Sequence, residues 1–320
     1  MCFVKNFDLG KIYNTGKDNW YMLKKPGTID ISLHKIYSED NLELDAILFK
    51  TKASKKKVIV HIHGKEGHFI QNHFVTMMGY QYPLEGYSFL TFNNRGHDYM
   101  ADMLQRGTQG FEWVKKGTAF DLLKEVVLDI NGVVSYLIDL GFEEIILQGH
   151  SVGPHKICYY MANQPKYDIS KIILLSTADI IYILDAMVPN WRKYSKLAEE
   201  MIKKGKGKEL MPITLWSEAL VCAETFWDFT NEESDSWIFN FKEPEREFKY
   251  FNQIKEPMLV VNPENDVAVG TRQDKVSDLL RKNTVSRDFR SVVIKNAIHN
   301  FASKETELVT KIVSWLKVVQ

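Results

Sequence analysis

The sequence predicts an α/β fold in which a mostly parallel, doubly wound sheet carries an inserted helical cap, and three features of the chain lead to this prediction. Short apolar runs without polar alternation recur along the sequence, as in strands that are covered on both faces. Segments with helical periodicity separate these runs, which is the alternation typical of a doubly wound sheet. One long aromatic-rich stretch, residues 181–250, interrupts the alternation.

The predicted strands begin with an antiparallel hairpin. Residues 29–36 and 42–49 show alternating patterns and flank the polar stretch 38–41, so we expect them to pair at one edge of the sheet. The continuous apolar runs that follow are the predicted buried strands, and they cover residues 58–62, 88–92, 144–147, 171–175, 258–261 and 291–294.

Helices are predicted between these strands. Apolar residues recur at helical spacing from Leu122 to Ile138, and Gly141 follows where the end of a helix favours glycine. Residues 155–162 are helix-like, and residues 303–318 show helical periodicity again at the end of the chain.

The aromatic-rich stretch divides the chain into two parts. We assign residues 1–180 and 251–320 to the core of the fold, and residues 181–250 to a helical cap or lid in which no strand is expected. Large rings are usually core residues, because they dominate burial. The alternative is that they line a pocket for an apolar or aromatic substrate, with Trp191, Trp216 and Trp227 as the candidates.

The composition is that of a soluble globular protein. Of the 320 residues, 45% are hydrophobic and 26% are charged. Lys plus Arg and Asp plus Glu number 41 each, so the formal net charge is zero and no global field attracts nucleic acid or an anionic membrane surface. We therefore expect neither as a partner, and no stretch of about 18 apolar residues suggests a membrane span.

The N-terminus and the cysteines point to a cytoplasmic protein. Residues 1–14 lack a sustained apolar run of signal-peptide length. Cys2, Cys158 and Cys222 are widely spaced and odd in number, which favours reduced thiols over a disulfide framework or a zinc site. Cys158 is expected to be packed rather than reactive. Nothing in the sequence specifies the oligomeric state, and a homodimer is compatible with it.

The strongest chemical signal is the pentapeptide Gly149-His150-Ser151-Val152-Gly153, a G-x-S-x-G motif. It follows a predicted strand and precedes a predicted helix, which is the strand–turn–helix setting of a nucleophile elbow. Flanking side chains would collide with the neighbouring strand and helix, so glycine is needed on both sides of the serine. Ser151 is therefore the candidate nucleophile.

A serine hydroxyl needs a base that takes its proton and an acid that orients this base. Around such an elbow the acid and then the histidine follow later in the chain. Asp266 lies in the loop after the predicted strand 258–261 and is the candidate acid, with Glu264 in the same loop as the alternative. His299 lies in the loop after the last predicted strand and is the candidate base.

The oxyanion hole needs two backbone N–H groups that point at the developing negative charge. We expect one from Val152, directly after the nucleophile, and one from Lys65, in the loop after the strand 58–62. The competing interpretation of His61 and His63 as metal ligands lacks the H-x-H-x-D-H spacing of a metallo-hydrolase, so neither a metal nor another cofactor is expected.

Together with the elbow, several further segments resemble those of a recognisable family. The turn Asn93–Asp98 looks like the turn after the fourth strand of many α/β-hydrolases. The other segments are 63–69, 147–151, 174–179 and 205–212. From about residue 30 onward, the chain resembles a largely uncharacterised group of hydrolases that is similar to fungal siderophore esterases and, more distantly, to feruloyl-type esterases. This resemblance implies an α/β-hydrolase fold and a carboxylic-ester hydrolase with Ser151, Asp266 and His299 as its triad.

The predicted function is thus cleavage of a carboxylic ester, or a related acyl bond, of a small molecule through an acyl-enzyme. An acyltransferase or thioesterase would use the same residues with another acceptor or leaving group. A non-catalytic binding protein with this fold is a further alternative, against which the presence of all three candidate residues argues.

Overall fold

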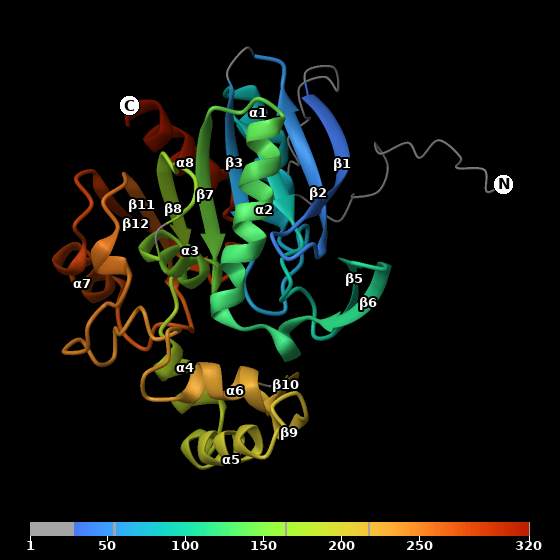
Figure 1. Cartoon of the computed structure of the whole chain (residues 1–320). Coiled ribbons are helices and arrows are strands. Elements are labelled where there is room, and N and C mark those ends of the chain that lie inside the picture. The colour runs from blue at the N-terminus through green and yellow to red at the C-terminus, as the bar shows by residue number, and fades with distance from the viewer. Residues whose placement is uncertain (1–28, 54–55, 164, 217, 320) are drawn as a thin grey trace, which may run out of the picture.

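A central sheet of eight strands forms the middle layer of the molecule (Figure 1). The computed structural model describes residues 29–53, 56–163, 165–216 and 218–319. The strand order is β1-β2-β4-β3-β7-β8-β11-β12, and all neighbours from β4 to β12 run parallel, whereas β2 is antiparallel to both β1 and β4. This confirms the predicted mostly parallel sheet with an antiparallel hairpin at one edge.

Every predicted strand is confirmed within a few residues. The hairpin consists of β1 (Ile29–Tyr37) and β2 (Glu43–Thr51). The other six strands of the sheet are β3 (Lys57–Ile62), β4 (Ser88–Phe92), β7 (Glu144–His150), β8 (Lys171–Leu175), β11 (Met258–Asn265) and β12 (Phe289–Ile298).

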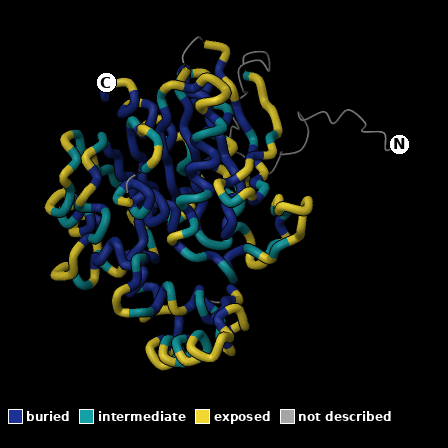
Figure 2. The backbone as a smooth tube through the Cα atoms, viewed as in Figure 1, coloured by how far each residue is buried: buried dark blue, intermediate teal, exposed yellow. Residues whose placement is uncertain are grey.

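Helices cover both faces of this sheet. Successive side chains of a strand point to opposite faces, so the apolar residues of each buried strand pack against helices on both sides. In β3, Val58 and Val60 pack into the hydrophobic cluster under α2 (Val126–Asp139), α3 (Gly153–Ala162) and α7 (Gln273–Asn283). Ile59 packs into the opposite cluster, under α1 (His73–Leu84) and α8 (Glu305–Val318). Figure 2 shows the resulting buried interior around the sheet.

The predicted start of the helix at Leu122 was wrong. A short 3-10 turn, Leu123–Glu125, comes first, and α2 itself begins at Val126. The predicted end is confirmed: α2 ends at Asp139, and Gly141 has a φ of 86°, the left-handed conformation that glycine adopts without steric cost.

The segment after β8 packs partly on itself. It comprises α4 (Ile180–Met187), α5 (Trp191–Lys203), β9 (Leu210–Leu215), β10 (Ala219–Cys222) and α6 (Ala223–Thr230), which lie together at one end of the molecule in Figure 1. Here we call these elements the cap. The expectation of no strand was wrong, since β9 and β10 pair as an antiparallel hairpin. Further along, Phe239 and Phe248 pack into the cluster under α2 and α3 instead, so the end of the 181–250 segment belongs to the main core.

A second hairpin was missed by the sequence patterns. Strands β5 (Ala101–Gly107) and β6 (Gly110–Lys116) form a separate small sheet that projects from the body (Figure 1). Met103 and Val114 are opposite each other and pack on the main core, whereas Phe111 and Trp113 are exposed.

The two cysteines among the described residues are both buried. Cys158 and Cys222 are buried free thiols, and burial raises the pKa of the Cys158 thiol, as expected for a packed residue. Cys2 and the stretch 1–14 lie outside the described residues. Within the described parts of the chain, no helix has the length and apolar character needed to cross a membrane.

Candidate active site

Ser151 lies at the sharp turn between β7 and α3, as the G-x-S-x-G motif predicted. Its φ is 63°, in the left-handed region that non-glycine residues rarely adopt. The Ser151 N–H donates to the Leu175 carbonyl at the end of β8, with 3.0 Å between N and O. The turn therefore fixes the backbone of the serine in a strained conformation at the carboxyl edge of the sheet.

The glycines of the motif are explained by the closeness of the backbone around them. A Cβ on Gly149 would lie 2.5 Å from the carbonyl carbon of Gly153. A Cβ on Gly153 would lie 2.3 Å from the carbonyl oxygen of Ile62, in the adjacent strand β3. Neither position has room for a side chain, so the steric reason predicted for the glycines holds.

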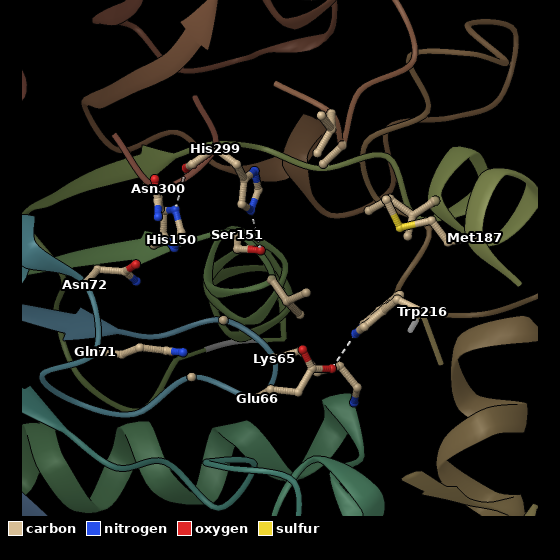
Figure 3. Close-up of a pocket in the computed structure, with 16 residues that line it drawn as sticks. Lys65, Glu66, Gln71, Asn72, His150, Ser151, Met187, Trp216, His299 and Asn300 are labelled. Carbon is tan, nitrogen blue, oxygen red and sulfur yellow. Dashed lines mark hydrogen bonds between the residues drawn. The ribbon is translucent and has the colours of Figure 1, made fainter. Parts of the chain in front are cut away.

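Ser151, His299 and Asp266 form one chain of contacts. His299 Nε2 lies 3.0 Å from Ser151 Oγ, and His299 Nδ1 lies 2.8 Å from Asp266 Oδ1 (Figure 3 shows Ser151 and His299). The Asp266 side chain is fully buried, and its Oδ1 also accepts the N–H of Ala268 at 2.9 Å. These are hydrogen-bond distances, and they place the His299 ring between Ser151 and Asp266.

Glu264, the alternative acid, has a different partner. Its Oε2 accepts the backbone N–H of Asn296 at 2.8 Å, and the residue is exposed. Of the two carboxylates in this loop, Asp266 is the one that contacts His299.

Two side chains that flank the site hold the backbone of His299. The His299 carbonyl oxygen lies 2.8 Å from His150 Nε2 and accepts the Ser176 hydroxyl at 2.7 Å. Burial holds the pKa of His150 well below its usual value, so this ring is neutral and can donate its single N–H from Nε2. The role of His150 and Ser176 could not be read from the sequence, because each acts on a carbonyl that is far away along the chain.

The loop after β3 lies directly against the elbow. A Cβ on Gly64 would come within 2.8 Å of the Ser151 Cβ and 3.2 Å of the Val152 N. The Lys65 side chain is only 2% exposed although the residue as a whole is partly exposed, so its main chain is the part that faces the cavity. Both expected backbone donors, Lys65 and Val152, thus border the same space beside Ser151.

His61 and His63 are both buried and have protein partners. His61 Nδ1 lies 3.0 Å from Gln148 Nε2, and the Asn94 N–H donates to His63 Nε2 at 3.1 Å. Burial lowers the pKa of both imidazoles, that of His61 to about 3. No group of three or more His, Cys, Asp or Glu side chains suited to a metal ion occurs among the described residues.

Ser151 and His299 open into a cavity of about 280 Å³ (Figure 3). In this view the amides Gln71 and Asn72 lie on one side of Ser151, and Met187 and Trp216 lie on the other. The further side chains of the lining include Ile183, Val267 and Ala268, which are apolar, and Asn300. Met187 ends α4 and Trp216 follows β9, so the cap supplies part of the apolar wall.

Of the three cap tryptophans that were the candidates for a pocket lining, Trp216 is the one that lines this cavity. Trp191 and Trp227 do not line this cavity but border a different one of about 540 Å³, which the cap forms together with residues 231–246. Trp191 is buried, and its indole N–H donates to Asp185 at 2.8 Å, so it is held in the interior of the cap. Aromatic density alone could not separate these two environments.

Comparisons with known proteins place the chain in a family and in a fold. A family model described as "protein of unknown function (DUF1749)" matches residues 117–317, more than half of the chain. No curated protein matches the sequence.

Among solved structures, the siderophore hydrolase EstB from Aspergillus fumigatus is similar at 16% identity with a TM-score of 0.66, over 92% of this chain and 98% of that one. Est1E from Butyrivibrio proteoclasticus, solved with ferulic acid bound, is similar at 18% identity with a TM-score of 0.59, over 89% and 99%. A monoglyceride lipase from Saccharomyces cerevisiae is similar at 13% identity with a TM-score of 0.63, over 94% and 98%.

At these identities the likeness concerns the fold, and the sheet order, the helices on both faces and the elbow after β7 agree with it. This chain therefore has the α/β-hydrolase fold and belongs to the family described as protein of unknown function (DUF1749).

Proposed function

We propose that this protein is a serine hydrolase that cleaves a carboxylic ester of a small molecule through an acyl-enzyme on Ser151. The observation that carries this proposal is the chain of hydrogen-bond contacts from Asp266 through His299 to Ser151, beside a cavity that Ser151 and His299 line. Nucleophile, base and orienting acid in this order are the arrangement that acyl transfer requires.

The first step is attack of Ser151 Oγ on the carbonyl carbon of the ester. His299 Nε2 takes the hydroxyl proton, while Asp266 accepts a hydrogen bond from the Nδ1–H of the ring and stabilises the imidazolium that forms. His299 then protonates the leaving alcohol, which releases it and leaves the acyl group on Ser151. In the second step His299 activates a water molecule that hydrolyses the acyl-enzyme.

The tetrahedral intermediate carries a negative oxygen that needs donors. We assign this task to the backbone N–H groups of Val152 and Lys65, which border the cavity beside Ser151. Each such donor is worth about 10²–10³ in kcat in serine hydrolases.

The substrate is proposed to have an apolar acyl or alcohol group. Ile183, Met187, Trp216 and Val267 supply an apolar wall next to Ser151. The similar structures are described with a siderophore, ferulic acid and a monoglyceride, three unlike molecules. We therefore take the expected group from this cavity and not from any of them.

A panel of esters and thioesters, run on the wild type beside Ser151→Ala, tests the proposal. We expect hydrolysis by the wild type, covalent labelling of Ser151 by a fluorophosphonate, and loss of both in the variant. Added alcohols or amines would reveal an acyltransferase through transfer products. Hydrolysis that survives in Ser151→Ala would reject the mechanism, and a wild type that is neither labelled nor active would indicate a binding protein.

A further inference from the structure

A hydrogen bond between Glu66 and Trp216 joins the loop beside the elbow to the cap. The Trp216 indole N–H donates to Glu66 Oε1, and both residues line the cavity at Ser151 (Figure 3). Trp216 directly follows β9 of the cap, and Glu66 directly follows Lys65, the proposed backbone donor. The contact thus spans 150 residues of sequence and connects the apolar wall of the cavity with the proposed oxyanion hole.

On the loop side, the backbone at Glu66 is held in a conformation that needs support. Its φ is 54°, in the left-handed region that is costly for a residue with a side chain. The Glu66 N–H donates to Thr118 Oγ1 at 2.7 Å, and the Thr118 hydroxyl donates to the Gly96 carbonyl at 3.1 Å. These two bonds hold the peptide that follows Lys65, and the carboxylate of Glu66 adds a third contact from outside the loop.

On the cap side, the partner is held in a similar way. Trp216 has a φ of 36°, again in the left-handed region, and its ring packs edge-on against Phe229 of α6 with 6.4 Å between centroids. The Lys65 Nζ lies over the same Phe229 ring, 4.2 Å from its centroid. Loop and cap therefore meet at two places, the carboxylate–indole bond and the contact of Lys65 with Phe229.

The hydrogen bond matters because the carboxylate is partly removed from water. Burial raises the pKa of Glu66, and the indole N–H opposes this by stabilising the ionised form. Bonds to a charged acceptor are about twice as strong as neutral ones. Removal of the indole donor would therefore leave a half-buried carboxylate without this donor at a strained position of the loop.

We propose that Glu66 is a positioning residue, whose carboxylate ties the cap to the loop and so aims the Lys65 N–H at the oxyanion. The inference rests on the proposed function. Under this proposal, a shift of the cap also disturbs the loop at Lys65. The reason is that Trp216 both lines the apolar wall and holds the loop through Glu66.

Three variants test this coupling by kinetics on a short acetate ester. Trp216→Phe removes the donor and keeps an aromatic ring, Glu66→Ala removes the acceptor, and the double variant completes a cycle. We expect each single variant to lower kcat about tenfold with little change in KM, because a misaimed Lys65 N–H would weaken the hydrogen bond to the oxyanion, which forms in the transition state and not on substrate binding. The double variant should lose no more than the worse single variant.

Glu66→Gln and Trp227→Phe serve as controls. The amide of Gln retains an acceptor oxygen, so kcat should lie between the values of the wild type and Glu66→Ala. Trp227 belongs to the cap but borders the other cavity, so its substitution should leave kcat unchanged. Thermal melting identifies any variant that fails to fold. In NMR spectra, the Trp216 indole N–H resonance, assigned by its loss in Trp216→Phe, should shift in Glu66→Gln.

The outcomes separate the two proposals. Suppose the wild type is active, but the kcat losses of the two single variants multiply in the double variant, or only KM changes. Either result would reject the coupling and leave the proposed hydrolase function standing. A wild type that hydrolyses no ester and escapes fluorophosphonate labelling would reject the proposed function, and the positioning role with it.

Discussion

Asp266 and Glu264 lie two residues apart in one loop, yet they meet different partners. Asp266 is buried against His299 Nδ1, and Glu264 is exposed and accepts the N–H of Asn296. Asp266→Asn should lower kcat by about 10⁴, because the amide favours the wrong tautomer of the histidine ring. Glu264→Gln should keep the wild-type kcat. Steady-state kinetics of both variants on the same ester checks the assignment, and equal losses would contradict it.

Among single residues, the sequence could predict the candidate site residues whose position follows from the order of the strands. Ser151, Asp266 and His299 each follow a predicted strand, and parallel strands bring their carboxyl ends to one edge of the sheet. The choice between Asp266 and Glu264 stayed open, because two residues of a loop differ only in the direction of their side chains. His150 and Glu66 were not assigned roles, because their partners lie 149 and 150 residues away.

At the scale of the element, the elbow depends on the contact between β3 and α3. Gly153→Ala would place a Cβ 2.3 Å from the Ile62 carbonyl oxygen, so α3 must move and carry the turn at Ser151 with it. We expect destabilisation of about 1–3 kcal/mol, typical of overpacking, together with a large loss of kcat. Urea unfolding and ester hydrolysis measure the two effects.

Gly141→Ala is the matched control for this prediction. Its φ of 86° is unfavourable for alanine, but a Cβ there meets no atom within 4 Å. The variant should lose about 1–2 kcal/mol of stability from backbone strain and retain the wild-type kcat. If both glycine variants lost stability and kept full activity, the elbow would tolerate a shift of α3, and the steric argument would fail.

The elements that the sequence predicted are those with a clear period. Buried strands such as β8 are continuous apolar runs, and α8 has a regular apolar stripe, so both could be identified. The hairpins β5–β6 and β9–β10 could not. β9 contains Pro212 and has a mixed burial pattern, and β6 is exposed along most of its length, so neither shows the alternation of a half-buried strand.

At the scale of the whole molecule, a buried ionic cluster joins the turn after β4 to α2. The Arg95 guanidinium donates twice to Asp129 Oδ1, at 2.8 and 2.9 Å, and the Asp129 side chain is fully buried. Asp129→Asn removes the fully buried carboxylate and leaves Arg95 with its less buried partners Asp40 and Glu125, so we expect a loss of about 1.5–3 kcal/mol in the free energy of unfolding. Glu199→Gln, which breaks the exposed pair with Lys203, should cost less than about 0.5 kcal/mol. Similar losses in both variants by urea unfolding would contradict the special role of burial.

The contact between the cap and the core contains a carboxyl whose charge should depend on pH. Asp228 of α6 accepts the N–H of Leu123 at 3.2 Å, and burial raises its pKa to about 6. Lys65 opposes this shift by favouring the ionised form, whereas Asp121 and Asp235 add to it. Because the folded protein holds this proton more tightly than the unfolded chain, the contribution of Asp228 to stability is fully present below about pH 4. It is lost as the pH rises through about 6.

Asp228→Asn keeps an acceptor for Leu123 and removes the titration. The variant should therefore gain stability relative to the wild type as the pH rises, by about 3 kcal/mol in total above pH 6, of which roughly half is present at pH 5. Urea unfolding of both proteins between pH 5 and 7.5 measures this difference. A difference that stays constant over this range would mean that Asp228 titrates at its ordinary pKa, and that the α6 contact with the core is open to water.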